Sequence, residues 1–123
     1  MDFKINKIIE EHISVTNMLS KQKNLINDIC DLSLKTILDD KKIILCGNGG
    51  SASDSLHISS ELVGRFYKDR KSFPAISLNS NISSITAIAN DYGYSEVFSR
   101  QIEGLGNEGD LLIAISTSGK SKN

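Results

Sequence analysis

The first 40 residues carry apolar side chains at the spacing of an α-helix. Between Phe3 and Leu38 these side chains recur three or four positions apart, which places them on one helical face. They are Ile5, Ile8, Ile9, Ile13, Leu25, Ile26, Ile29, Leu34, Ile37 and Leu38. The pattern predicts two helices, or one long bent helix with a weak point near Ser20. Because the stripe is longer than one small α/β unit can cover, we expect residues 1–40 to serve packing and oligomerisation.

After Lys41 the pattern changes to short, nearly continuous apolar runs. Such runs are typical of strands that are covered on both faces of a parallel sheet. They are residues 43–45, 75–78 and 111–115, and helical patterns lie between them at residues 51–66, 82–89 and 95–105. Alternating strands and helices predict a doubly wound α/β domain over residues 41–123. Three strands make a thin sheet, so we expect this domain to be incomplete at its C-terminus.

The overall composition excludes several classes of partner. Fourteen basic and fifteen acidic residues give a net charge of −1, so no global field attracts nucleic acid or an anionic membrane. No apolar stretch approaches the roughly 20 residues that span a bilayer, and residues 1–10 do not resemble a signal peptide. We therefore expect a cytoplasmic protein that binds neither nucleic acid nor membrane. Cys30 and Cys46 lack a CxxC spacing and suit reduced, buried thiols.

A glycine-rich stretch follows the first predicted strand. In the segment CGNGGS, residues 46–51, a strand leads through glycines into a helix, whose free N–H groups and dipole attract an anion. We expect Ser51 to be the N-cap, with Asp54 completing a short capping box. The segment also matches G-x-G-x-x-A of dinucleotide-binding domains. That interpretation fails because the next strand ends in residues 79–81, Asn-Ser-Asn, without the acidic residue that binds the ribose.

A second polar loop follows the last predicted strand. Residues 114–121, AISTSGKS, match a relaxed P-loop in which Ala114 replaces the first glycine. This alanine lies inside the apolar run and cannot form the turn that wraps a phosphate chain, so a nucleotide P-loop is not expected. The hydroxyl and amide groups are better suited to bind a single phosphate. A simple polar turn remains an equal alternative.

The predicted helix after the glycine loop carries a polar stripe. Asp54, His57, Glu61 and Arg65 fall in one sector of about 80° at 100° per residue. This stripe could be a solvated face with an ordinary ion pair between Glu61 and Arg65. Alternatively, His57 and Glu61 could ligate one metal ion or act on one proton. Two ligands do not complete a zinc site, so further ligands would come from elsewhere.

Taken together, four segments resemble the sugar isomerase (SIS) family, and most closely its phosphoheptose isomerases. The segments are GNGGSASDSLHISSELVGRF, AIANDYG, FSRQIE and GDLLIAISTSGKS. The combination H-x-x-x-E-L-x-G-R with a following N-D is the most specific of these features. The resemblance extends over residues 41–123, and the N-terminal helical part also fits.

The resemblance implies a function and a set of site residues. It implies isomerisation of sedoheptulose 7-phosphate to D-glycero-D-manno-heptose 7-phosphate through a cis-enediol, for lipopolysaccharide or capsule synthesis. His57 and Glu61 would bind one zinc ion and would together form the catalytic pair. Glu61 would also be the base that moves the proton. Arg65 would orient Glu61 or reach the substrate. The other implied substrate contacts are Asn48, Gly49, Gly50 and Ser51, then Asn90 and Asp91 for the sugar, and Ser116, Thr117, Ser118 and Ser121 for the phosphate.

The resemblance also implies an assembly and leaves alternatives open. Family members form homotetramers with active sites at subunit interfaces, and a later helix supplies a glutamine and a second histidine as metal ligands. Since this sequence stops before that helix, we expect the chain alone to be inactive. One alternative is a non-catalytic regulator that contacts the replication initiator protein. Another is a sugar-phosphate sensor that needs no metal.

Overall fold

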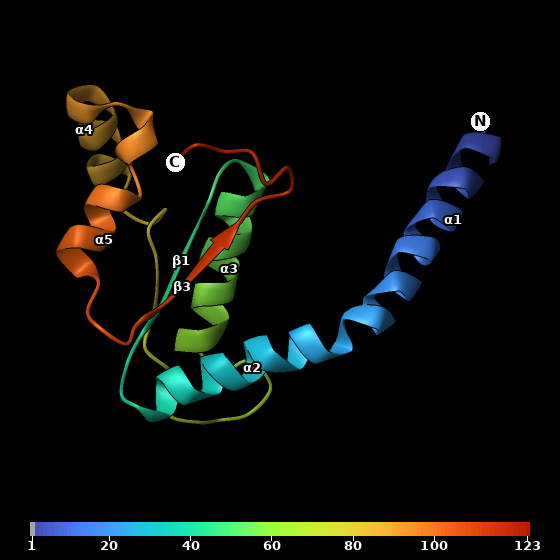
Figure 1. Ribbon diagram of the computed structural model, residues 1–123, viewed down its shortest axis with the longest axis horizontal. Helices are drawn as coiled ribbons and strands as arrows, with labels where there is room; N and C mark the ends of the chain where they lie inside the picture. The colour runs from blue at the N-terminus through green and yellow to red at the C-terminus, as the bar shows by residue number, and fades with distance from the viewer. Residues whose placement is uncertain (1) are drawn as a thin grey trace. The chain divides into compact units, whose positions relative to one another are not determined.

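The computed structural model describes residues 2–123, and the chain divides between Leu32 and Ser33 into two compact units (Figure 1). The first unit contains α1 (Asp2–Leu19), a 3-10 turn η1 (Ser20–Gln22) and the beginning of α2 (Lys23–Leu38). The predicted weak point near Ser20 is confirmed, because the 3-10 turn begins at that residue. In the described part of the chain, no helix has the length and apolar character needed to cross a membrane. The division at residue 40 between a helical segment and the α/β domain stays a prediction.

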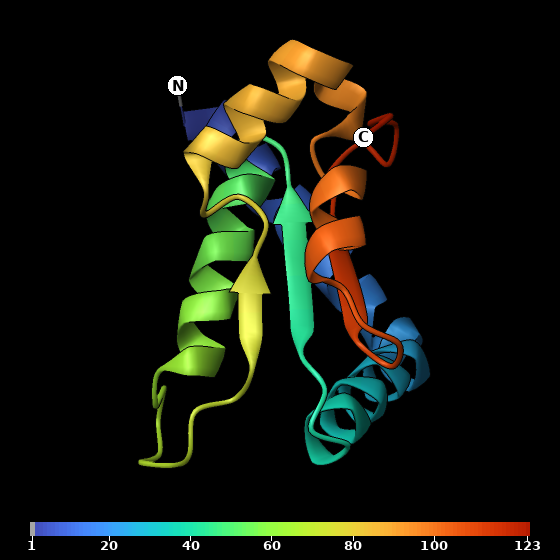
Figure 2. The same cartoon turned by 90° about the vertical axis from the view of Figure 1, so that its left-hand side faces the viewer.

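The second unit is built on three parallel strands. These are β1 (Ile43–Gly47), β2 (Ala75–Ser77) and β3 (Leu111–Ile115), in the order β2-β1-β3. Between them lie α3 (Gly50–Val63), α4 (Ile82–Tyr92), the 3-10 turn η2 (Tyr94–Glu96) and α5 (Ser99–Leu105). Figures 1 and 2 show α3 on one face of the sheet and α5 on the other. The predicted doubly wound α/β fold is confirmed.

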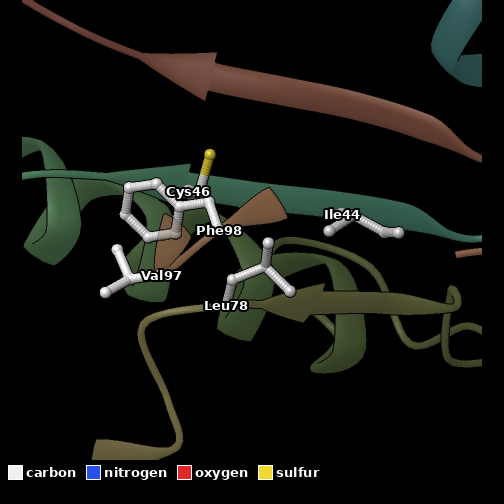
Figure 3. Packing of buried hydrophobic residues seen from close by; sticks show 5 residues of the cluster. All are labelled: Ile44, Cys46, Leu78, Val97 and Phe98. Atoms are coloured by element: carbon white, nitrogen blue, oxygen red, sulfur yellow. The ribbon is translucent and has the colours of Figure 1, made fainter. Parts of the chain in front are cut away.

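The core lies between the sheet and the α4–α5 layer. Ile44 and Cys46 of β1 pack there against Leu78, Val97 and Phe98, as Figure 3 shows. Every residue of β1 is buried, as expected for a strand covered on both faces. Burial raises the pKa of the Cys46 thiol and keeps it protonated.

Two expectations about burial are wrong. Strand β3 alternates between half-buried and exposed positions, and Leu112 is 45% exposed, because β3 lies at the edge of the sheet. Cys30 is exposed, since the unit that ends at Leu32 buries none of its described side chains. The apolar side chains of the stripe as far as Ile29 are likewise exposed within that unit.

Several helix ends differ from the predicted ones. Helix α3 ends at Val63, three residues early, because Gly64 turns into extended backbone and Phe66 adopts a φ of 49°. The helix predicted over residues 95–105 is interrupted before Ser99, where the side chains of Val97 and Phe98 enter the core. Helix α4 runs past Ala89 to Tyr92. Its start is capped by Asn81, whose side chain accepts a hydrogen bond from the Ser84 N–H at 3.0 Å.

A buried carboxylate joins the beginnings of β1 and β3. Asp110 precedes β3, and its carboxylate accepts hydrogen bonds from the backbone N–H groups of Lys42 at 2.9 Å and Asn107 at 2.8 Å. The Lys42 ammonium group also pairs with this carboxylate, whose side chain is only 6% exposed. Burial alone would raise the pKa of Asp110, but these hydrogen bonds and the lysine charge outweigh it and lower the pKa to about 2. The contact fixes the register of the two strands.

We predict that Asp110 makes stability depend on pH between its unfolded and folded pKa values. The folded pKa of about 2 lies below the ordinary value of 3.8, so the stabilisation is complete above pH 3.8 and disappears as the pH falls toward 2. Asp110→Asn should lower the free energy of unfolding at pH 7 by about 2 kcal/mol, a typical value for a charge-assisted hydrogen bond. The variant should also lose less stability than the wild type between pH 4 and pH 2. Urea unfolding at several pH values measures both effects.

The matched control is Glu108→Gln, which neutralises an exposed carboxylate in the same loop. It should leave both the stability at pH 7 and the acid slope unchanged. Equal acid slopes for Asp110→Asn and the wild type would contradict the proposed role of Asp110.

Candidate active site

The carboxyl ends of β1 and β3 bring two polar loops together. The β1–β3 register pairs Gly47 with Ile115, so the glycine loop and residues 116–121 leave the sheet side by side. A cavity of about 90 Å³ lies between them. It is lined by Asn48, Ser51, Ile115, Ser116, Thr117, Ser118 and Ser121. All of these except Ile115 are residues expected to contact the substrate or its phosphate.

The glycine loop is held tightly against the start of α3. A Cβ atom on Gly47 would lie 2.5 Å from the Ser51 carbonyl oxygen, so only glycine fits at the end of β1. Gly49 has φ 58° and ψ −120°, a conformation that glycine adopts without strain. It serves as the N-cap of α3, without a side-chain cap. The prediction of Ser51 as N-cap is therefore wrong: Ser51 lies inside the first turn and is buried.

The loop after β3 is ordered by its own hydroxyl groups. The Ser116 hydroxyl accepts a hydrogen bond from the Gly119 N–H at 3.0 Å, and the Ser118 hydroxyl accepts one from the Lys120 N–H at 3.2 Å. This compact turn, with its hydroxyl groups beside the helix start, is suited to a single phosphate group.

Asn48 has partners that the sequence did not indicate. The Tyr94 hydroxyl donates a hydrogen bond to Asn48 Oδ1 at 2.9 Å, and the side-chain amides of Asn48 and Asn123 bond to each other at 2.9 and 3.1 Å. Tyr94 lies in the NDYGY segment, 46 positions away in sequence, and no local pattern could assign it to the glycine loop. These contacts orient the Asn48 side chain at the rim of the cavity.

Asn79 binds the backbone of the glycine loop and was also missed. Its side-chain amide bonds to both the N–H and the carbonyl of Gly47, at 3.1 and 3.0 Å. The sequence argument noted that residues 79–81 lack an acidic side chain and assigned no role to Asn79. Their position after β2 was the available signal, since the ends of parallel strands meet at one edge of a sheet.

The second part of the candidate site lies further along α3. His57 Nε2 and Glu61 Oε1 are 3.2 Å apart, one turn from each other on the exposed side of the helix. They line a mainly apolar cavity of about 300 Å³ together with Ile58, Leu62, Phe66 and Arg70. An imidazole nitrogen and a carboxylate oxygen on one helical face suit two of the four positions around zinc. The described residues contain no group of three or more His, Cys, Asp or Glu side chains that could hold a metal ion.

The structure does not bring all expected residues together. The cavity beside His57 and Glu61 shares no residue with the cavity between the two loops. Asn90 donates a hydrogen bond to Asp91 at 2.8 Å at the exposed end of α4, and neither lines these two cavities. Arg65 lies beyond the last residue of α3, because the helix ends early. It therefore leaves the polar stripe, and the side chain that contacts the Glu61 carboxylate is His57 instead.

Comparison with known proteins gives consistent results. The family model described as SIS domain matches residues 9–123. The phosphoheptose isomerase of Sulfurimonas denitrificans is 49% identical over 97% of this chain and 63% of its own length. That of Helicobacter pylori (strain ATCC 700392 / 26695) is 60% identical over 75% of this chain and 48% of its own length. The chain thus spans about half to two thirds of these curated relatives.

Solved structures support the same relationship. A phosphoheptose isomerase from Francisella tularensis superimposes with a TM-score of 0.84 at 33% identity, over 98% of this chain and 65% of that one. One from Neisseria gonorrhoeae gives a TM-score of 0.76 at 35% identity, over 97% of this chain and 64% of that one. Since the family model covers nearly all of the sequence and the fold agrees, the chain belongs to the SIS domain family.

Proposed function

We propose that the protein is an aldose–ketose isomerase that converts sedoheptulose 7-phosphate to D-glycero-D-manno-heptose 7-phosphate. The observation that carries the proposal is the His57–Glu61 pair, 3.2 Å apart on the helix that begins at the anion-binding loop. The relatives named phosphoheptose isomerase, 49% and 60% identical, support the same substrate. We place the reaction in the cytoplasm, as a step toward lipopolysaccharide or capsule.

The chemistry requires a fixed substrate and a carboxylate base. The Ser116–Ser121 hydroxyl and amide groups would hold the phosphate, while Asn48 and the loop N–H groups would bind sugar oxygens. Glu61 would remove a proton from C1 of the ketose and return it to C2, and the O1 proton would pass to O2. The phosphate contacts keep both carbons aligned with the base through the cis-enediol.

We propose that His57 and Glu61 also contribute to a zinc site. The remaining ligands would come from outside the described residues, because these contain no third side chain grouped with this pair. A bound zinc ion would stabilise negative charge on the sugar oxygens. His57 would hold its ring at this position through the 3.2 Å contact with Glu61.

We propose further that the functional form is a homotetramer whose sites combine residues of different copies. Ten residues of α3 separate Ser51 from Glu61, so about 15 Å of helix axis lies between them at about 1.5 Å per residue. An extended seven-carbon sugar phosphate measures only roughly 10 Å from C1 to phosphorus on ordinary bond lengths. This difference favours a site in which one copy holds the phosphate and another supplies Glu61. The exposed apolar stripe of α1 and α2 offers a surface for association.

The function is tested by substituting the base. Glu61→Gln keeps the shape of the side chain but cannot accept the proton, so the conversion of sedoheptulose 7-phosphate should fall by roughly 10²- to 10⁴-fold. The measurement is aldose formation, together with deuterium incorporation at C2 in D2O, by the gene product purified from its own source. Its mass should also be recorded, to establish whether residues beyond 123 belong to it.

The control for this substitution is Asp54→Asn on the same exposed side of α3, which should retain wild-type turnover. Absence of turnover in a wild-type protein larger than 13.4 kDa would overturn the isomerase proposal. Binding of the sugar phosphate that is equally tight with and without zinc would then indicate a sensor.

The zinc site is tested without catalysis. His57→Ala removes one zinc ligand. Loss of only the hydrogen-bond partner of a ligand lowers metal affinity by roughly tenfold, so loss of the ligand itself should lower zinc affinity by more than that. Competition with a chromogenic chelator measures this affinity. His12→Ala, which removes the other histidine of this sequence, should bind zinc like the wild type. Equal affinities for the His57 variant and the wild type would contradict the proposed ligand.

A further inference from the structure

The strand pairing between β1 and β2 is extended by one side chain. The regular register ends at the pair Leu45 and Ser77, where β2 stops. Two residues later the Asn79 carboxamide takes the place of a peptide group. Its Oδ1 accepts from the Gly47 N–H at 3.1 Å, and its Nδ2 donates to the Gly47 carbonyl at 3.0 Å. Asn79 thereby satisfies both backbone groups of the residue at which the glycine loop begins.

Buried hydroxyl groups fix the orientation of this carboxamide. The Ser55 hydroxyl of α3 lies 3.0 Å from Asn79 Oδ1 and 2.7 Å from the Ser77 hydroxyl. The Ser77 hydroxyl in turn accepts from the Asn79 N–H at 3.2 Å. Ser55 and Ser77 are 0% and 2% exposed, so water does not compete for these bonds. Turning the carboxamide over would place its NH2 group against the Gly47 N–H, which excludes the alternative orientation.

The position of Gly47 controls the anion-binding loop. Its Cα lies so close to Ser51 that no side chain fits, and the first turn of α3 begins between them. A small movement of the Gly47 peptide therefore moves Asn48 and Ser51, which line the cavity between the two loops. We propose that Asn79 is a positioning residue, which holds the glycine loop in the geometry that binds the phosphorylated sugar. The phosphorylated sugar as the ligand rests on the proposed function, whereas the role of Asn79 in holding Gly47 does not.

The side-chain chemistry at position 79 makes the inference testable. Asn79→Ala removes both hydrogen bonds to Gly47. Asn79→Asp keeps the size of the side chain but removes the donor for the Gly47 carbonyl, so the new carboxylate repels that oxygen without creating a cavity. The matched control is Asn81→Ala, two residues away. It removes the N-cap of α4 and lowers the stability of the chain without touching Gly47.

The first measurement is amide hydrogen exchange by NMR. In the wild-type 123-residue chain the Gly47 N–H should be protected, and Asn79→Ala should speed its exchange by about tenfold, the factor for loss of one hydrogen bond. Asn81→Ala should leave the Gly47 rate unchanged at a comparable loss of thermal stability. An unprotected Gly47 N–H in the wild type, or equal rates in the two alanine variants, overturns the inference.

The second measurement is calorimetric titration with sedoheptulose 7-phosphate. Asn79→Ala and Asn79→Asp should each weaken binding by about tenfold or more, and Asn81→Ala should bind like the wild type. Wild-type affinity in Asn79→Asp overturns the positioning role and leaves the proposed function intact. If the wild type does not bind this sugar phosphate while the Gly47 exchange rates behave as expected, the proposed function fails. The conclusion that Asn79 holds Gly47 in place is then retained.

Discussion

The close approach of Gly47 to the Ser51 backbone is the constraint on which the candidate site depends. With 2.5 Å between the Ser51 carbonyl oxygen and the place of a Cβ atom, the strand must pass directly into the helix. The start of α3 consequently lies beside the loop after β3, because Gly47 and Ile115 are paired in the sheet. A side chain at position 47 would separate α3 from the sheet and open the cavity between the two loops.

Much of the fold follows from local patterns in the sequence. The uninterrupted apolar run at β1 indicated a strand buried on both faces, and the structure buries all five of its residues. The same argument failed for β3, because burial on a face depends on which elements lie over it and not on the strand itself. It failed again near Val97 and Phe98, where two buried side chains in succession favour the core over a continuous helix. Tertiary packing, absent from a sequence pattern, decided both cases.

The candidate site also combines contacts that local sequence spacing predicts with contacts between residues far apart in the sequence. His57 and Glu61 are four residues apart on a helix, so their proximity could be predicted from spacing alone. Arg65 continues that spacing but leaves the helix, because Gly64 and the positive φ of Phe66 end α3 first. Asn79 lies 32 positions from Gly47 in the sequence, and Tyr94 lies 46 positions from Asn48. Their contacts with the glycine loop are visible only in the folded chain.

The separation of the two half-sites has a consequence for how catalysis would be controlled. Under the proposed arrangement, the loop that holds the phosphate and the Glu61 carboxylate that acts on the sugar belong to different copies. Each copy would then be competent to bind the phosphate but would depend on a neighbour for the base and the metal. Association, rather than a movement within the chain, would complete the site. Under this arrangement, dilution would reduce turnover before it reduced the binding of phosphate.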